Sequence, residues 1–179
     1  MMYSIAYGID KFVLNNLCED GTGEYTTPAG GFTTAANCLT IFAALLSKVA
    51  GYQNAYKGTY IVLENTDLAG LIVAQGTNGW NMADLALRNG LASNWLGVDI
   101  YVVRSGTFVS DTLGTITLTN SGHRVFGVKG VSTYASPRGI QYEEKGVTAK
   151  TGKEVVVYGL VGFKQWTQTA GLTVDITLA

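Results

Sequence analysis

The chain has 179 residues, the length of one domain or of one domain with two lobes. Its net charge of −1 gives no electrostatic footprint for direct nucleic-acid binding, and the chain opens without a secretory signal, so we expect an intracellular protein. Only 14% of the residues are charged, against about 25% in average soluble domains. Buried subunit contacts would explain the deficit, and so would a Gly- and Thr-rich β surface that uses hydroxyl groups.

The first part of the chain predicts a helix followed by a loop. Apolar residues recur at helical spacing between Tyr3 and Leu17. The expected inner face of this helix consists of Ile5, Ile9, Phe12, Val13 and Leu17. From Glu19 to Gly31 the chain is rich in Gly, Thr and Pro, which predicts a loop. Its Gly21-Thr22-Gly23 lacks the Gly-Lys-Ser/Thr of a phosphate-binding loop.

The stretch from Thr33 to Tyr52 predicts a central core helix. It is apolar around most of its circumference, so we expect it to be covered on at least two sides. Thr33 or Thr34 is expected to cap its N-terminus through the side-chain oxygen, and Gly51 to end it. Polar residues interrupt the stretch, which is also too short for a membrane span.

The middle of the chain predicts short strands and helices in alternation. Thr59–Glu64 and Gly97–Arg104 are rich in Val, Ile and Tyr, which favours strands. Asn65 or Thr66 is expected to cap a short helix running through Ile72. A second short helix is expected over Met82–Arg88, after Asn81.

The last third predicts mainly antiparallel strands. Thr107–Thr119 has the alternation of a hairpin with its turn near Asp111–Gly114. His123–Tyr134 is ambiguous, because its valines favour a strand and its glycines interrupt one. The remaining expected strands are Ile140–Glu144, Glu154–Phe163 and Leu172–Leu178. Most predicted helices lie in the first part of the chain and most predicted strands in the last part. This separation indicates an α+β fold rather than a parallel α/β sheet.

The sequence contains no motif that predicts a catalytic, cofactor-binding or metal-ligating residue. His123 is the single histidine and has no visible partner to orient it, so we interpret it as structural. Cys18 and Cys38 lack metal-ligand spacing, and we predict two buried reduced thiols rather than a disulfide. Glu143 and Glu144 are adjacent and would point to opposite faces of a strand. We therefore expect no enzyme and no cofactor.

The tryptophans and several aspartates are spread along the sequence. Trp80, Trp95 and Trp166 are scattered, which favours core or interface packing over stacking on nucleic acid. Asp10, Asp67 and Asp84 are far apart in the sequence and carry a site only if the fold brings them together.

The order of several short motifs resembles a known family. These motifs are Gly8-Ile9-Asp10, Gly21-Thr22-Gly23, Thr27-Pro28-Ala29-Gly30-Gly31, the apolar helix, Leu63-Glu64-Asn65, Asn89-Gly90-Leu91, Leu96-Gly97-Val98-Asp99-Ile100-Tyr101-Val102, His123-Arg124-Val125-Phe126-Gly127-Val128-Lys129 and Tyr158-Gly159-Leu160-Val161-Gly162-Phe163. Together they resemble the major capsid proteins of tailed double-stranded DNA phages, whose Hong Kong 97-like fold is also used by encapsulins. The resemblance covers about Ile9 to Leu178.

The resemblance implies a shell subunit with an axial and a peripheral lobe. Residues 1–32 would be the end of a long spine helix and a loop of the peripheral lobe. Residues 33–125 would form most of the axial lobe, and residues 126–179 the peripheral-lobe strands and a return strand. Family members carry an N-terminal arm and an extended hairpin before the spine helix, which are missing here, so the resemblance predicts a chain that is monomeric or associates weakly on its own.

The function implied is that of a structural subunit. Copies would self-assemble into pentamers and hexamers of an icosahedral phage capsid that encloses DNA, built in the bacterial host cytoplasm. The expected partner is the chain itself, with scaffold, maturation protease and decoration proteins as further candidates, packaged DNA as an indirect one, and no membrane. Two alternatives stay open: an encapsulin-like compartment shell, and a small hydrolase or binding domain whose site is not visible in the sequence.

Overall fold

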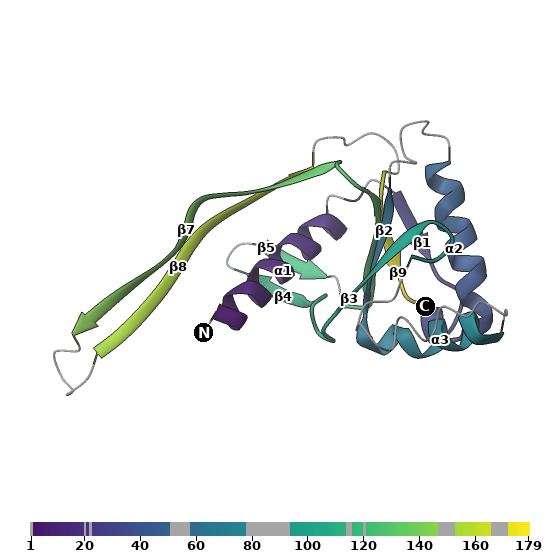
Figure 1. The fold of residues 1–179 in the computed structure, drawn as a ribbon, viewed down its shortest axis with the longest axis horizontal. Coiled ribbons are helices and arrows are strands. Elements are labelled where there is room, and N and C mark those ends of the chain that lie inside the picture. The colour runs from purple at the N-terminus through teal and green to yellow at the C-terminus, as the bar shows by residue number, and fades with distance from the viewer. Residues whose placement is uncertain are drawn as a thin grey trace.

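The computed structural model describes residues 2–19, 21, 23–50, 58–77, 94–113, 116–119, 121–146, 153–165 and 172–179. Its centre is a five-stranded sheet with the strand order β1-β9-β6-β2-β3 (Figure 1). These strands are β1 (Gly23–Thr26), β9 (Thr173–Thr177), β6 (His123–Val128), β2 (Thr59–Glu64) and β3 (Val98–Val103). The pairs β1-β9 and β2-β3 are parallel, and the pairs β9-β6 and β6-β2 are antiparallel. The α+β class is confirmed, with a mixed sheet.

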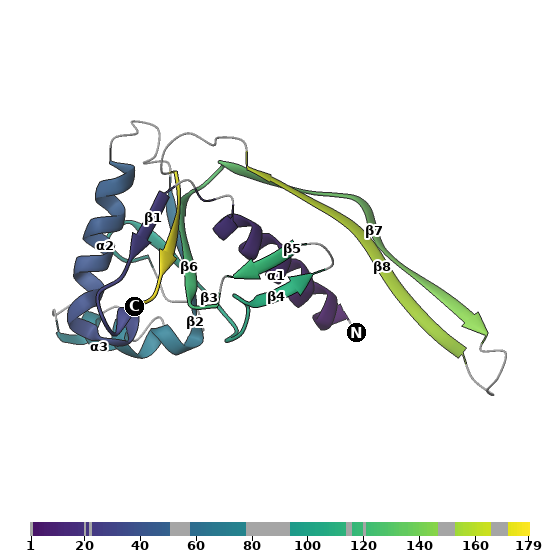
Figure 2. The same ribbon diagram turned by 180° about the vertical axis from the view of Figure 1, so that it is seen from behind.

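Helices cover both faces of this sheet. In β2, Ile61 and Leu63 belong to the larger apolar core, whereas Val62 faces the other way into a smaller one. The larger core lies against α2 (Ala35–Val49) and α3 (Leu68–Thr77). The smaller core lies against α1 (Met2–Glu19), on the opposite side of the sheet (Figure 2). Because β2 is buried on both faces, its sequence is a continuous apolar run rather than an alternating pattern.

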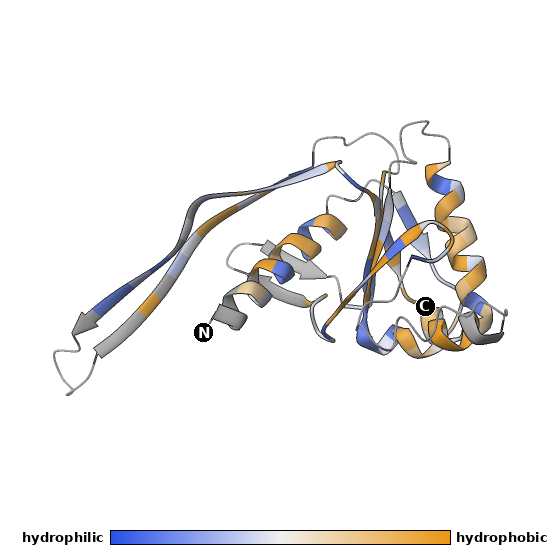
Figure 3. Ribbon diagram, in the orientation of Figure 1, coloured by the Kyte–Doolittle hydropathy of each residue, from blue (hydrophilic) through white to orange (hydrophobic). Residues whose placement is uncertain are grey.

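The expected core helix is confirmed as α2. Its buried side chains follow helical spacing and form one stripe: Cys38, Ile41, Phe42, Leu45 and Val49. The Phe42 ring packs against Trp95, with ring centroids 4.5 Å apart. Hydrophobic residues occur along most of α2 (Figure 3), and Leu39, which lies outside the buried stripe, is 46% exposed. α2 thus packs against both the sheet and α3, and part of its remaining surface is exposed.

The ends of α2 differ from the predicted caps. Thr34 occupies the N-cap position, but its side chain makes no capping hydrogen bond. The neighbouring Thr33 hydroxyl donates instead to the Gly30 carbonyl, 2.6 Å away. At the other end, Ala50 follows the helix in a right-handed helical conformation. The predicted cap at Gly51 lies outside the described residues.

The predicted first helix is confirmed as α1, but its buried face is rotated. Leu14, Leu17 and Cys18 are buried against the sheet, while Ile9 and Phe12 are only half-buried. The helix turns Leu14 inward because Phe108 and Val125 form the other side of that core. The prediction of buried, unpaired thiols is confirmed, since Cys18 and Cys38 are both free and buried.

The expected loop over residues 19–31 contains a strand that the sequence pattern missed. β1 pairs in parallel with β9 over Gly23–Thr26, and its burial alternates along the strand. A four-residue segment with one large apolar side chain, Tyr25, gives too little periodicity to predict a strand. Its partner β9 comes from the far end of the chain.

The predicted short helix after β2 is confirmed, but its start differs. A 3-10 turn over Asn65–Asp67 precedes α3, and its N-cap is Glu64 rather than Asn65 or Thr66. The Glu64 backbone N–H donates to the Asp67 carboxylate at 3.0 Å, as part of a reciprocal capping box. Along α3, a Cβ added at Gly70 would lie 2.2 Å from the Phe32 carbonyl oxygen, so this close helix contact requires glycine.

The remaining strands form two hairpins outside the main sheet. The predicted first hairpin is confirmed as β4 (Ser110–Leu113) and β5 (Ile116–Thr119), although Asp111 lies within β4 rather than in the turn. The second hairpin pairs β7 (Ser132–Gly146) with β8 (Lys153–Gln165) and projects away from the sheet (Figures 1 and 2). Both of its strands are longer than predicted.

The ambiguous segment over His123–Tyr134 is resolved as the end of one strand and the start of another. β6 ends at Val128, and a turn with Gly130 at a φ of 90° leads into β7. The helix predicted over Met82–Arg88, like Trp80 and Trp166, lies outside the described residues. Among the helices that are described, none has the length and apolar character needed to cross a membrane.

Candidate functional site

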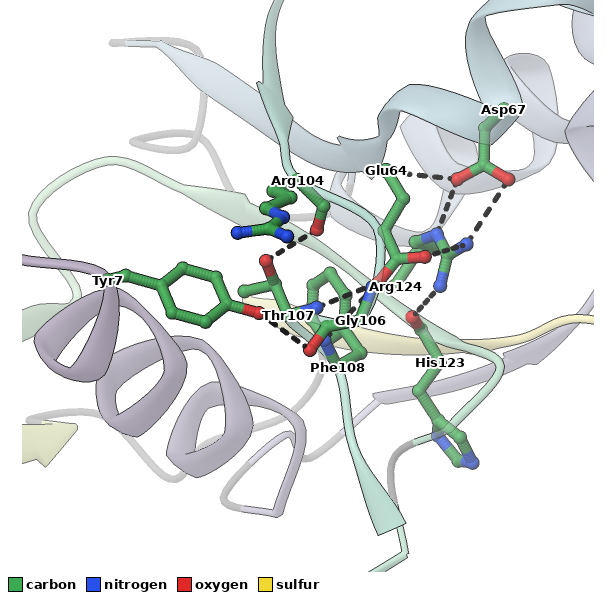
Figure 4. Close-up of polar contacts among 9 residues, drawn as sticks. All are labelled: Tyr7, Glu64, Asp67, Arg104, Gly106, Thr107, Phe108, His123 and Arg124. Carbon is green, nitrogen blue, oxygen red and sulfur yellow. Dashed lines mark hydrogen bonds and ion pairs between the residues drawn. The ribbon is translucent and has the colours of Figure 1, made fainter. Parts of the chain in front are cut away.

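Three charged side chains meet in the interior and form what we call the hub: Glu64, Asp67 and Arg124. Arg124 extends from β6, and its guanidinium lies between the two carboxylates (Figure 4). Its Nε is 2.5 Å from Asp67 Oδ2, and its Nη2 is 3.2 Å from Glu64 Oε2. Nη1 donates to the His123 carbonyl at 2.6 Å. All three side chains are buried, so each charge depends on these partners.

The hub also holds the loop that follows β3. Glu64 Oε1 accepts hydrogen bonds from the backbone N–H groups of Gly106, Thr107 and Phe108, at 3.0, 3.1 and 3.3 Å. The Phe108 ring lies beneath the Arg124 guanidinium at 5.4 Å. One carboxylate thus binds an arginine with one oxygen and a loop backbone with the other.

The same loop fixes α1 on the sheet. The Tyr7 hydroxyl donates to the Gly106 carbonyl at 3.0 Å (Figure 4). The buried Asn15 side chain donates to the Thr107 carbonyl at 3.0 Å and accepts from the Val109 N–H at 3.2 Å. A chain of polar contacts therefore runs from α1 through the loop to the hub and into β6.

His123 has a partner that sequence spacing did not reveal. Its Nδ1 lies 2.7 Å from Asp175 Oδ2, on the neighbouring strand β9. Burial raises the pKa of Asp175, against the hydrogen bond from His123. Burial, reinforced by the nearby Asp175 carboxylate, also raises the pKa of the Cys18 thiol. The thiol is therefore held protonated and is a poor nucleophile, which fits a structural role for this group.

The other residues considered from the sequence do not assemble into a reactive site. Asp67 joins the hub, while Asp10 is exposed on α1 and Asp84 lies outside the described residues. Glu143 and Glu144 are both exposed on β7. Within the described ranges, no three His, Cys, Asp or Glu side chains lie together in a way that could hold a metal ion.

The hub itself was missed in the sequence. The signal available was an arginine directly before the apolar residues of β6, at Arg124-Val125-Phe126, together with acidic residues where β2 ends. An ionisable residue in a buried strand needs a buried partner, but the sequence does not say which carboxylate supplies it.

Several large apolar side chains are exposed at separate places on the surface. Leu39 of α2 and Val73 of α3 (56% exposed) lie at the helical end of the molecule. Tyr142 (76%), Tyr158 and Leu160 (59%) are exposed on the long hairpin. A groove of about 500 Å³ lies between α1, β3 and the start of β7, and it includes Ile9, Val13, Tyr101 and Tyr134. Of these features, the groove is the one where several apolar side chains line a common surface, which is the arrangement that marks interaction sites in soluble proteins.

No family model and no curated protein matches the chain in sequence. Its structure is similar to a chain of Mycobacterium phage Che8, with a TM-score of 0.70 and 18% identity over 98% of this chain and 60% of that one. It is also similar to a chain in the capsid of cyanophage P-SCSP1u, with a TM-score of 0.67 and 13% identity over 100% of this chain and 64% of that one.

A further similar structure is the virus-like particle from Pyrococcus furiosus, with a TM-score of 0.58 and 10% identity over 96% of this chain and 63% of that one. The chain thus spans less than two thirds of the length of each of these three proteins. At such identities the likeness establishes the fold alone. The chain has the Hong Kong 97-like fold shared by phage capsid proteins and the shell of a virus-like particle.

Proposed function

We propose that this chain is a structural subunit of an icosahedral bacteriophage capsid, which self-assembles through pentamers and hexamers into a shell around packaged DNA. The observation that carries the proposal is the match of nearly the whole chain to a phage capsid structure. Exposed apolar residues on α2, α3 and the long hairpin support it, because subunit contacts would bury them. Rings follow when different surfaces of neighbouring copies meet head to tail.

The proposed lobes follow the expected division of the chain. Residues 33–125 would form most of the axial lobe, residues 1–32 would belong to the peripheral lobe, and residues 126–179 would supply the peripheral-lobe strands and a return strand. The long hairpin supports a peripheral lobe, because it projects well beyond the main sheet (Figure 1). β1 and β9, however, pair into the main sheet beside β6, so chain segments from both ends would support the axial lobe.

The polar contacts favour a structural role over a catalytic one. Arg124 and backbone N–H groups donate hydrogen bonds to the hub carboxylates. These carboxylates therefore have little capacity left to act on a substrate. We therefore propose that the hub fixes the angle between α1 and the sheet, and that the chain is no enzyme. In a shell, that angle would set how neighbouring subunits meet. A virion location, with assembly in the host cytoplasm, belongs to the same proposal.

An encapsulin-like compartment shell is the second candidate. It is favoured by the similarity to a virus-like particle over 96% of this chain. The two candidates differ in contents, since a phage capsid encloses DNA and a compartment holds protein cargo. Nucleic acid or protein recovered from purified particles distinguishes them.

Sedimentation velocity over a wide concentration range tests self-association, with electron microscopy of the fastest species. We expect weak, concentration-dependent association that passes beyond dimers to ring-shaped particles. The Leu39→Gln variant should associate more weakly than the parent, because it makes an exposed α2 position polar and leaves the buried stripe intact. A chain that stays monomeric at every concentration, or that turns over a small molecule, would contradict the proposal.

A further inference from the structure

The two strands of the long hairpin differ in how they present their outer edges. β7 contains Pro137, which lacks an N–H group, and its pairing with β8 shifts register on both sides of Arg138. Irregularities of this kind protect an edge against pairing with another strand. β8 contains no proline, so every residue keeps its N–H group. In the part of the chain that the structure describes, β7 is the only strand that pairs with β8.

The composition of β8 is typical of a strand that is buried inside a protein. From Val155 to Phe163 it has no charged side chain, and Tyr158 carries the one polar group, a pattern typical of strands buried on both faces. Yet the hairpin has only two strands, and Tyr158 and Leu160 are exposed on it. Such an edge can accept an added strand.

The backbone of β8 shows which groups are available. The Leu160 carbonyl accepts a hydrogen bond from Ser136 of β7 at 3.3 Å, so it points into the hairpin. Along a strand these groups alternate in direction, which turns the N–H and C=O of Gly159 toward the open edge. Gly159 is also the middle residue of the strand Lys153–Gln165.

We propose that β8 pairs antiparallel with β8 of a second copy of this chain, with Gly159 on the two-fold axis. In this register Glu154 lies opposite the partner subunit's Lys164, and Tyr158 lies opposite the partner subunit's Leu160. The two-fold axis repeats each pair, so acidic and basic residues meet at both ends of an apolar centre. The result is a four-stranded ribbon, β7-β8-β8-β7, whose outer edges are the irregular β7 strands.

The charges select both the partner and the register. Backbone alternation allows only registers that shift the strand in steps of two residues. A shift of the axis to Tyr158 or to Leu160 removes the Glu154–Lys164 match and places Glu154 opposite an uncharged residue. A second copy of β8 therefore supplies an apolar strand of equal length with the complementary charges at its ends. This inference deepens the proposed function and rests on it, because both require copies to associate.

Disulfide cross-linking tests the contact. Residues directly opposite each other in an antiparallel pair have Cα atoms about 4.5–5.5 Å apart, within the range that a disulfide spans. Under mild oxidation we expect Gly159→Cys to give covalent dimers about tenfold faster than Gly139→Cys. Gly139 is the matched control, because it is an exposed glycine on β7 of the same hairpin, with open space around it. The native cysteines are buried, and the parent chain measures their contribution.

Charge exchange tests the register. In the Gly159→Cys chain, either Glu154→Lys or Lys164→Glu should slow dimer formation about tenfold, because each places like charges opposite each other at both ends of the ribbon. Combining both substitutions should restore it. Glu154 is also the register partner of Lys145 within the hairpin, and Lys164→Glu does not restore opposite charges at that position, so rescue is specific to pairing between copies.

Each outcome separates this inference from the proposed function. Equal cross-linking of Gly159→Cys and Gly139→Cys, or no rescue in the double variant, overturns the β8 pairing. If the chain nevertheless forms rings or shells, the proposed function stands, and the open edge of β8 contacts something other than β8 of a second copy. If the chain shows neither cross-links nor association, both fail.

Discussion

At the scale of single residues, the hub shows how charge can be buried in this fold. Two carboxylates and one guanidinium leave one surplus negative charge. Glu64, however, also accepts hydrogen bonds from three backbone N–H groups. Hydrogen bonds from backbone donors offset the loss of water around a carboxylate. The hub therefore holds together only while Arg124 and the loop are both in place.

Removing Arg124 should destabilise the chain strongly. Arg124→Ala leaves Glu64 and Asp67 buried without a counter-charge, and breaking a buried pair in this way costs about 3–5 kcal/mol. Arg124→Lys should recover only part of the loss, because an ammonium cannot reproduce the guanidinium's contacts with both carboxylates. Urea unfolding measures both variants. Lys129→Ala, which removes an exposed ion pair with Asp99, is the control and should change little.

Buried ionisable groups should also make the fold sensitive to alkali. Burial raises the pKa of Tyr60 from 10.0 to about 12 and that of Cys38 from 9.0 to about 11. Since both pKa values are raised in the folded state, their contribution to stability is complete below the unfolded pKa. It is lost as the pH rises through the folded value. We expect the free energy of unfolding to fall from pH 9.0 upward.

Tyr60→Phe isolates one of these contributions, because it keeps the ring and removes the ionising hydroxyl. Its free energy of unfolding, measured by urea at a series of alkaline pH values, should fall less steeply than that of the parent between pH 10.0 and about 12. Parallel curves for the two proteins would show that the tyrosine does not contribute.

At the scale of elements, the inner face of α2 holds the larger core together. Leu45 has no exposed surface and lies in the stripe that packs against the sheet. Leu45→Ala should lower the free energy of unfolding by about 2–5 kcal/mol, the range for emptying a packed site. Leu39→Ala on the outer face should cost about 0.5 kcal/mol or less. Chemical denaturation of both variants compares the two faces, and equal losses would refute the assignment of the core.

Sequence patterns predicted the elements whose side chains repeat regularly. Thr59–Glu64 matches β2 residue for residue, because both of its faces are apolar. The patterns failed where the cause was tertiary. Tyr25 gave no strand signal because β1 exists only through β9, and Leu14 turns inward because Phe108 lies opposite it.

The candidate site was less predictable still. The link from Arg124 to Asp67 and Glu64 joins residues about sixty positions apart, and the pair of His123 with Asp175 joins residues 52 apart. Periodicity carries no information about such distant pairs. The sequence shows that Arg124 precedes an apolar strand segment, but it does not show that Asp67 and Glu64 are its partners.

At the scale of the whole molecule, two outer surfaces lie at opposite ends (Figure 1). The long hairpin is at one end, with β8 proposed to pair about a two-fold axis, and α2 with Leu39 is at the other. A two-fold contact alone stops at a dimer, whereas a head-to-tail contact alone closes a ring. A shell requires both kinds of contact, because rings must be joined to other rings.

Variants at the two ends should therefore block different steps of assembly. Lys164→Glu should slow pairing through β8 about tenfold and leave ring formation intact. Leu39→Gln should weaken ring formation and leave Gly159→Cys cross-linking intact, because α2 is remote from the hairpin. Sedimentation and cross-linking of both variants separate the steps, with circular dichroism confirming that each remains folded. If either variant abolished both readouts while folded, the two surfaces would not act independently, and a single contact would have to account for assembly.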